Sequence, residues 1–390
     1  MSEWPMVKLG EVCKINPRRD KSITSSTEIS FIEMKSLLEN GSVHPVTVPA
    51  EKYLKGYTPF QNHDILIAKI TPCFQNGKIG LANIDTDFGF GTTEFHVVRS
   101  GETLSPEYLT FFLRQQWILD AGKKCMTGSG GQRRVPKAFL ENLKIPLPPL
   151  GEQKRIAEIL GGVSKAIQKT KVQLLLVDIL RENKYLSLSK DADTFKSLKD
   201  LGVKKITGKS IVAKPDNEHG INQIIKVSAV SSGRFIASET KPLPADYEPN
   251  NLHEIHQGDL LFARASGSAN LLGACCIVDK EIQHLYLPDK VWKLEVDEDI
   301  LPKVYLLQAL RGREFRSVAE SHFSSSTGVK NIKTSVLMEF KIPVLKKDQL
   351  NDYVHFVKTL DNLRHLLHRK LSLLQELQKS LATRAFAGLL

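Results

Sequence analysis

The sequence repeats itself, with matching segments in the two halves separated by about 196 residues. Residues 64–70 (DILIAKI) match residues 259–265 (DLLFARA). Further matches follow in the same order: Leu109, Leu113 and Arg114 with Leu306, Leu310 and Arg311; Thr127-Gly128 with Thr327-Gly328; residues 143–146 with 340–343; Glu152-Gln153 with Asp348-Gln349. Short matches in a constant order rarely arise by accident, so we interpret the chain as a duplication.

Each half is expected to contain a globular region followed by a helical segment. Short apolar runs bounded by Gly, Pro, Asn and Asp predict strands at residues 65–70, 79–84, 95–98, 221–227, 260–263 and 291–296. Helical stretches are expected at residues 106–116 and 302–311. Strands and helices do not alternate regularly, so the fold class is predicted to be α+β.

Two proline-free segments, starting near Glu152 and Asp348, predict long helices. Their apolar positions recur with a spacing of about 3.5, which is typical of a coiled-coil seam. At about 1.5 Å per residue each helix would be about 60 Å long. We expect the two helices to pair antiparallel, although two core helices buried in separate domains are the alternative. The seam positions are Ile156, Leu160, Val163, Ile167, Thr170, Leu174 and Val177, and Tyr353, Val357, Leu360, Arg364, Leu367, Leu371, Leu374, Gln378 and Leu381.

These patterns predict four segments: globular domains at residues 1–148 and 191–345, and helices at residues 149–190 and 346–390. The chain has 54 Lys and Arg against 43 Asp and Glu, a net charge of +11 that suits a polyanion such as nucleic acid. The second globular region has equal numbers of basic and acidic residues. Any nucleic-acid contact there must therefore be a local patch.

Chemistry that would mark an enzyme was sought and not found. The sequence has no P-loop, and its nearest approaches to methyltransferase and nuclease motifs lack the required context. The five cysteines show no C-x-x-C spacing, and the H-x-x-H pair at residues 253–256 has no third ligand nearby. The pair at residues 365–368 lies beside basic residues and is interpreted as a solvated or phosphate-facing strip. We therefore expect a non-catalytic binding protein without metal or cofactor of its own. The N-terminus resembles no signal peptide and no apolar run is long enough to span a membrane, so a cytoplasmic location is expected.

The glycine-rich loop at residues 126–135 (MTGSGGQRRV) is the best candidate for a DNA contact. Its small residues allow close approach to a phosphate, and Gln and Arg pair bidentately with adenine and guanine edges. A hairpin tip with incidental charge, or rim residues held in salt bridges, is the alternative. The candidate residues are Lys69, Thr71, Lys78, Thr92, Thr93, Ser129, Gln132, Arg133 and Arg134 in the first half, and Arg264, Ser266, Ser268, Ser325, Ser326, Thr327, Lys330 and Asn331 in the second.

Several strings resemble the DNA specificity (S) subunits of type I restriction-modification systems. They are residues 91–99 (GTTEFHVVR), 127–136 (TGSGGQRRVP), 143–150 (LKIPLPPL), 152–160 (EQKRIAEIL) and 381–388 (LATRAFAG). The resemblance extends over essentially the whole chain. It departs in the second half, where residues 346–349 (KKDQ) replace the L-x-E-Q form and the loop is less rich in glycine.

The resemblance implies a non-catalytic subunit with two target recognition domains that each read half of a split DNA sequence. Two long helices would set the gap between the halves. Partners would be double-stranded DNA, two modification subunits that methylate adenine with S-adenosylmethionine, and ATP- and Mg-dependent restriction subunits. Three readings remain open beside it: a coiled-coil scaffold for protein or RNA partners, the specificity region of another adenine methyltransferase system, and an enzyme with an unrecognised site.

Overall fold

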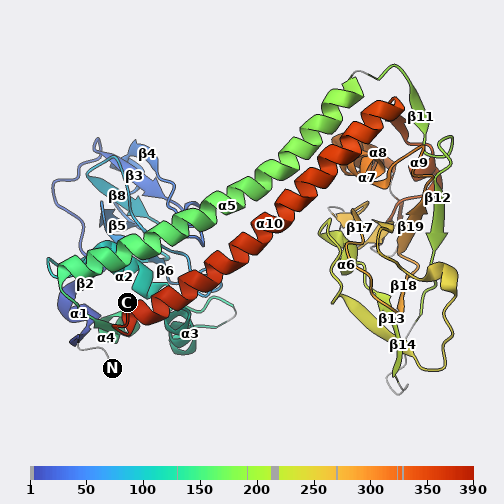
Figure 1. Ribbon diagram of the computed structural model, residues 1–390. Helices are drawn as coiled ribbons and strands as arrows, with labels where there is room; N and C mark the ends of the chain where they lie inside the picture. Colours follow the sequence, from blue (N-terminus) through green and yellow to red (C-terminus); the bar gives the residue numbers. More distant parts are fainter. Residues whose placement is uncertain are drawn as a thin grey trace. The chain divides into compact units, whose positions relative to one another are not determined.

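Strand-rich regions and two long helices make up the chain in the computed structural model (Figure 1). The structure describes residues 4–129, 131–190, 192–211, 219–268, 271–322, 324–326 and 329–390. The chain divides into two compact units. Unit 1 consists of Met1–Lys171 with Arg369–Leu390, and unit 2 of Val172–His368. None of the helices among these residues is long and apolar enough to cross a membrane.

Unit 1 contains two four-stranded sheets and a two-stranded ribbon. The first sheet has the order β2-β9-β6-β7 and the second β4-β3-β8-β5, while β1 pairs with β10. The strands are β1 (Met6–Lys8), β2 (Cys13–Ile15), β3 (Glu28–Ile32), β4 (Val46–Pro49), β5 (Thr58–Gln61), β6 (Ile65–Ala68), β7 (Ile79–Leu81), β8 (Phe88–Gly91), β9 (Phe95–Ser100) and β10 (Lys144–Pro146). The short helices are α1 (Leu9–Val12), α2 (Pro106–Leu113), α3 (Gln116–Cys125) and α4 (Lys137–Asn142).

Unit 2 repeats this plan. Its main sheet has the order β12-β19-β15-β17, beside the sheets β14-β13-β18 and β16-β21-β20 and the ribbon β11-β22. The strands are β11 (Phe195–Ser197), β12 (Lys204–Thr207), β13 (His219–Ile225), β14 (Thr240–Pro244), β15 (Leu260–Ala263), β16 (Ala265–Ser266), β17 (Cys275–Ile277), β18 (Leu285–Tyr286), β19 (Val291–Glu295), β20 (Ser324–Ser326), β21 (Val329–Asn331) and β22 (Lys341–Pro343). The short helices are α6 (Ser228–Ser231), α7 (Lys303–Arg311), α8 (Arg313–His322) and α9 (Thr334–Met338).

A buried tyrosine makes the same hydrogen bond in both units. The hydroxyl of Tyr108 donates to the carbonyl of Pro146 at 2.9 Å, and that of Tyr305 donates to Pro343 at 3.0 Å. The main sheets share one strand order, and β3–β8 and β13–β18 are both parallel pairs. The duplication and the α+β fold are thereby confirmed.

The structure corrects one predicted match between the halves. Thr127 pairs with Arg134, and Arg134 pairs with Ile70. In unit 2, Ser324 and Ala265 both pair with Asn331. The counterpart of Thr127 is therefore Ser324 and not Thr327, because strand pairing, and not the Thr-Gly dipeptide, sets the alignment of these loops.

Some predicted elements are shorter than expected. The run at residues 65–70 is a strand only to Ala68, after which Ile70 pairs with the loop at Arg134. Residues 106–116 do not form one helix, because α2 ends before Arg114 and a second helix, α3, begins at Gln116. Ser105 caps α2 by accepting a hydrogen bond from the Tyr108 amide, a common start for a helix with proline in its first turn.

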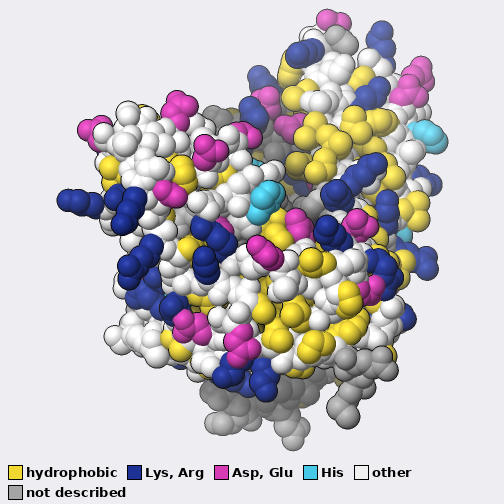
Figure 2. Space-filling view, turned by 90° about the vertical axis from the view of Figure 1, so that its left-hand side faces the viewer, with side chains coloured by type: hydrophobic (Ala, Val, Ile, Leu, Met, Phe, Trp, Pro, Cys, Tyr) yellow, Lys and Arg dark blue, Asp and Glu magenta, His cyan; other side chains and the backbone are white. Residues whose placement is uncertain are grey.

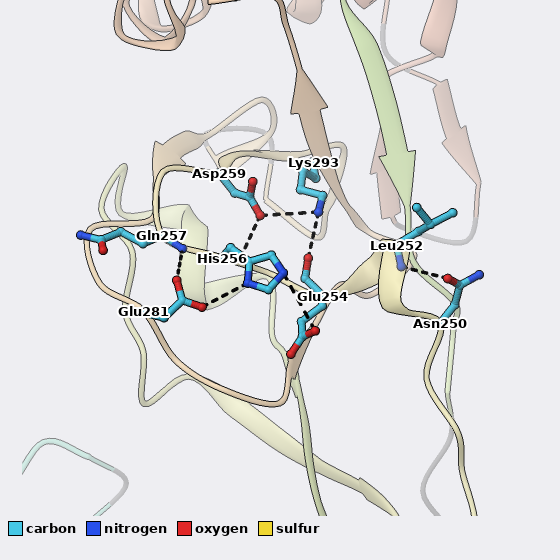
Figure 3. A network of polar contacts seen from close by, with 8 residues as sticks. All are labelled: Asn250, Leu252, Glu254, His256, Gln257, Asp259, Glu281 and Lys293. Atoms are coloured by element: carbon cyan, nitrogen blue, oxygen red, sulfur yellow. Dashed lines mark hydrogen bonds and ion pairs between the residues drawn. The ribbon is translucent and has the colours of Figure 1, made fainter.

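An aspartate before the central strand has the same role in both units. Asp64 accepts a hydrogen bond from the Gln61 amide at 2.7 Å, and Asp259 accepts one from the His256 amide at 2.9 Å. Asp64 is almost fully buried and is held by both forks of Arg99 at 2.7 and 2.8 Å. Asp259 instead lies 3.6 Å from the ammonium of Lys293 (Figure 3). Both units thus have an aspartate at this position, although the basic residues that pair with it, Arg99 and Lys293, do not occupy equivalent positions in their strands.

The two long helices are α5 (Leu150–Lys190) and α10 (Lys347–Phe386), green and red in Figure 1. They pair antiparallel within each unit. In unit 1, Ser164 bonds Gln378 and Arg155 donates to the Leu390 carbonyl; in unit 2, Asp178 pairs with Arg364 and Arg181 with Asp361. Most of the predicted seam is buried, as the coiled-coil pattern requires: Ile156, Leu160, Ile167, Thr170, Val177, Tyr353, Val357, Leu360 and Leu367.

Gln153 attaches the start of α5 to unit 1. Its amide is fully buried; it accepts from the Ser105 amide at 2.8 Å and donates to the carbonyls of Thr103 and Pro148 at 2.9 and 2.8 Å. Gln349 at the start of α10 accepts from the Lys346 amide at 3.0 Å. A satisfied buried amide of this kind fixes the direction in which a helix leaves its domain.

Candidate nucleic-acid interface

The loop at residues 126–135 is attached to the end of strand β6. The Thr71 amide donates to the Arg133 carbonyl at 2.9 Å, and the Val135 amide donates to the Lys69 carbonyl at 2.9 Å. Gly128 has φ 115° and Gly131 has φ 76°, values that side-chain-bearing residues rarely adopt. The glycines therefore allow a tight hairpin, and the backbone of its second arm, at Arg133 and Val135, is hydrogen-bonded to Thr71 and Lys69.

Three of the predicted contact residues on this loop are exposed. Ser129 and Gln132 face solvent, and the backbone N–H of Gln132 donates to the Ser129 carbonyl at 3.1 Å. Arg133 is also exposed, and its guanidinium donates to the Met126 carbonyl at 2.8 Å. That bond orients Arg133 without neutralising its charge, so the side chain keeps donors for an incoming phosphate or base.

Arg134 points elsewhere and forms an ion pair with Glu94. Its Nη2 and Nε lie 2.7 and 2.9 Å from the two carboxylate oxygens, and its Nη1 donates to the Gln132 carbonyl. The hydrogen bond from Arg134 lowers the pKa of Glu94 below its usual range. Sequence reasoning treated Arg134 as part of a free basic tip and missed Glu94, which lies 40 residues away.

The turn that carries Glu94 also places the predicted threonines. Thr92 is half-buried and its hydroxyl accepts from the Glu94 amide at 3.3 Å, while Thr93 is exposed. Behind the turn, His96 donates Nε2–H to the Val135 carbonyl at 2.8 Å, and burial lowers its pKa. A neutral His96 therefore ties strand β9 to the base of the loop.

Two further predicted residues, Lys78 and Thr71, use their side chains in hydrogen bonds within unit 1. The ammonium of Lys78 donates to the Met34 carbonyl at 3.0 Å, and the Thr71 hydroxyl donates to Gln75 at 2.7 Å. The structure brings Lys69, Thr71, Gln132 and Arg133 to one place through the strand-to-loop bonds. It gives Lys78 a partner on a different segment.

In unit 2 the equivalent loop forms the small sheet β16-β21-β20. Ser325 and Ser326 pair with Lys330 and Val329, and Lys330 and Asn331 are half-buried with partners of their own. Ser266 is buried and its hydroxyl accepts from the amide of Ser268, which is exposed. Thr327 lies outside the described residues.

Arg264 lies over an aromatic ring. Its guanidinium carbon is 5.7 Å from the centre of Trp292, and its Nε donates to the Asp289 carbonyl at 3.1 Å. The ammonium of Lys205 lies 5.0 Å from the same ring. Sequence reasoning missed Lys205 and Trp292. The sequence shows Lys205 only as a basic residue in a strand, and it does not show that Lys205 and Arg264 contact the same aromatic ring.

The face shown in Figure 2 carries charges of both signs. Figure 2 shows Lys and Arg side chains interspersed with Asp and Glu on the face that it presents. Among the described residues, no group of three or more His, Cys, Asp or Glu is arranged to hold a metal ion. On that face, local groups and not one extended basic field are the candidates for a DNA contact.

Comparison with known proteins locates these features in a family. Residues 1–176 match the family described as type I restriction modification DNA specificity domain. The EcoEI specificity subunit of Escherichia coli is 27% identical over 79% of this chain and 69% of its own length. Residues 1–176 thus contain a type I restriction modification DNA specificity domain, and a protein named as a type I specificity subunit aligns with most of the chain. The EcoAI specificity subunit of E. coli is 44% identical over 39% of this chain, and the match spans about a quarter (26%) of that relative.

A solved type I S subunit from M. genitalium has the same fold as this chain. The TM-score is 0.59 at 14% identity, and the match covers 99% of this chain and 96% of that one. The family match at residues 1–176 includes the glycine-rich loop, the Glu94 turn and the first part of α5. The loop attached to β6 is thus part of the region that matches the specificity-domain family.

Proposed function

We propose that this chain is the DNA sequence-specificity subunit of a type I restriction-modification complex and reads a bipartite target. One observation carries the proposal: both units attach an equivalent hairpin to the end of the same strand. Ile70 pairs with Arg134 in unit 1, and Ala265 pairs with Asn331 in unit 2. Two equivalent hairpins on a duplicated fold are suited to contact two DNA half-sites.

In the proposed first half-site, Gln132 and Arg133 are the residues placed to meet bases or phosphates. They are exposed at the loop tip, and their side chains are those that pair with adenine and guanine. Arg134 contributes less directly, because Glu94 occupies its guanidinium. The other proposed DNA-contacting residues are Lys69, Thr71, Lys78, Thr92, Thr93 and Ser129 in unit 1, and Arg264, Ser266, Ser268, Ser325, Ser326, Thr327, Lys330 and Asn331 in unit 2.

The proposed modification subunits need a docking surface, and α5 offers one in unit 2. Val172, Leu175, Leu176, Ile179 and Leu180 are between 41% and 60% exposed. Their spacing places them on one helix face outside the seam, a pattern that accepts a partner helix. We propose that two modification subunits bring S-adenosylmethionine and that restriction subunits bring ATP and Mg. The chain itself is then non-catalytic, with recognition domains at 1–148 and 191–345 and spacer helices at 149–190 and 346–390.

Selection from a random duplex pool tests the proposal. The full chain with its modification subunits is expected to enrich two short sequences separated by an unread spacer. Gln132→Ala should relax one base position in the first half-site only, at a cost of about 1 to 3 kcal/mol. Gln116→Ala, an exposed glutamine on α3, is the matched control. Enrichment of one contiguous site, or methyl transfer by the purified chain alone, would contradict the proposal.

A further inference from the structure

The same four-residue pattern, D-x-x-R, occurs once on each long helix. Asp178 and Arg181 lie on α5, and Asp361 and Arg364 lie on α10. Arg181 donates to the Asp361 carboxylate, and Arg364 forms an ion pair with Asp178. Residues three apart share a helix face, so the two motifs meet as a reciprocal pair of ion pairs within unit 2.

These guanidinium groups are largely removed from water. The side chain of Arg181 is 8% exposed and that of Arg364 is 16% exposed. Among the described residues, neither Nε has a hydrogen-bond partner. Burial lowers the pKa of Arg364. Since desolvation offsets most of the attraction in such pairs, they are a poor source of stability. We therefore consider whether these ion pairs disfavour other pairings of the two helices.

Beside these ion pairs the apolar seam is mostly aliphatic, while an aromatic contact between the helices, Tyr185 with Tyr353 at 6.5 Å between ring centroids, lies further along α5. Val177, Leu360 and Leu367 are its buried members here, and Leu363 and Leu366 offer further leucines at adjacent positions. A shift of three residues along the seam would bring Arg181 beside Arg364 in one direction, or Asp178 beside Asp361 in the other. The Arg181–Arg364 pairing would place like charges together where both guanidinium groups are poorly hydrated, which is strongly unfavourable. Asp178 and Asp361 are 53% and 48% exposed, so their repulsion in the other register is weaker but of the same sign.

We propose that Asp178, Arg181, Asp361 and Arg364 set the axial register of α5 against α10 and thereby the DNA spacer length. The inference rests on the proposed function. A shift of three residues corresponds to about 4.5 Å along the helices, or about one base pair. The four residues are positioning residues, since they touch no DNA in this scheme.

The duplication does not explain this feature. At the repeat offset of 196, the corresponding positions in unit 1 are Lys165, Gln168, Leu374 and Leu377, which cannot form the reciprocal pairs. The nearest polar contact there is a hydrogen bond of 2.6 Å between Gln378 and Ser164. The charged arrangement is therefore particular to unit 2.

Two variants with identical composition test the proposal. In the one-pair swap, Asp178→Arg is combined with Arg364→Asp. This variant keeps two ion pairs in the native register but makes the shifted pairings attractive. In the two-pair swap, Arg181→Asp and Asp361→Arg are added. That variant again has two native pairs and restores repulsion in the shifted registers, so it is the matched control.

The readout is binding of the full chain, in its modification complex, to duplexes whose spacer varies in single base-pair steps. Wild type and two-pair swap are expected to lose about tenfold or more in affinity per step, and the one-pair swap about threefold or less. Replacing all four residues by Leu is a second route to the same test. This variant should melt at or above the wild-type temperature yet discriminate spacers poorly.

Equal spacer discrimination by the wild type, the one-pair swap and the four-leucine variant would overturn the register role alone. A wild type that binds a contiguous site, or shows no spacer preference, would overturn both the register role and the proposed function. The two failures are therefore distinguishable in one set of measurements.

Discussion

The ion pair with Glu94 changes what Arg134 can contact. The hydrogen bonds to Glu94 make it part of the loop's internal structure, while the neighbouring Arg133 keeps an uncompensated charge at the tip. Adjacent arginines with the same sequence context thus differ in their availability to DNA. The difference lies in the direction that each side chain takes from a paired backbone, since side chains alternate along an extended strand.

Removing the charge of Glu94 should release Arg134. In Glu94→Gln, the freed guanidinium is expected to raise non-specific DNA affinity and to steepen the dependence on salt by about one unit of slope. Fluorescence anisotropy over a series of salt concentrations measures both. Glu28→Gln, an exposed glutamate on β3, is the control. An unchanged slope would show that Arg134 stays away from phosphate even when unpaired.

The same pair predicts a pH dependence of stability. The pKa of Glu94 in the folded chain lies below its ordinary value of 4.5. The stabilisation is therefore fully present above about pH 4.5, where the unfolded carboxyl is ionised, and is lost as the pH falls through the lower folded pKa. Urea unfolding at a series of acidic pH values should show a smaller decline for Glu94→Gln than for wild type. Identical acid limbs would contradict this assignment.

At the scale of elements, the repeated Tyr–Pro bond joins α2 to β10 and α7 to β22. Both tyrosines are buried, and burial raises the pKa of Tyr108 and Tyr305 well above the usual range. Both accepting carbonyls belong to the last residue of a Lys-Ile-Pro strand, β10 or β22, that precedes a long helix. The bond thus connects the helix that follows the main sheet to the exit toward α5 or α10.

Tyr108→Phe and Tyr305→Phe should both destabilise the chain. Each removes a buried hydroxyl and leaves a proline carbonyl unsatisfied, so a loss of about 1 to 3 kcal/mol in the free energy of unfolding is expected. Urea denaturation, followed by hydrogen exchange in each unit, measures the loss and assigns it. Large destabilisation by one substitution and none by the other would show that the two bonds are not equivalent.

At the scale of the whole molecule, the long helices run through both compact units, and in the proposed function their length should determine the DNA spacer. Inserting about seven residues after Leu174 and after Leu371 together keeps the seam in register and adds about 10 Å. The preferred spacer should then lengthen by about three base pairs, with the bases read in each half unchanged. Selection from a duplex pool gives both quantities. A changed half-site or an unaltered spacer would reject the helices as the ruler.

Periodicity and repetition in the sequence were sufficient to predict the duplication, the α+β class and both long helices. These features depend on patterns within short segments, such as the apolar spacing through Ile156, Leu160 and Ile167. The family resemblance rested on strings of the same local kind, including the Glu152-Gln153 dipeptide, whose glutamine the structure shows buried at the start of α5.

Only the tertiary structure decided which distant side chains meet. Glu94 and Arg134 are 40 residues apart, and Arg181 and Asp361 are 180 apart. Strand pairing likewise showed that Ser324, and not Thr327, corresponds to Thr127. The spacing of residues along the chain encodes which face a side chain occupies. The partner on the opposite face depends on strand register and helix pairing, which form only when the chain is packed.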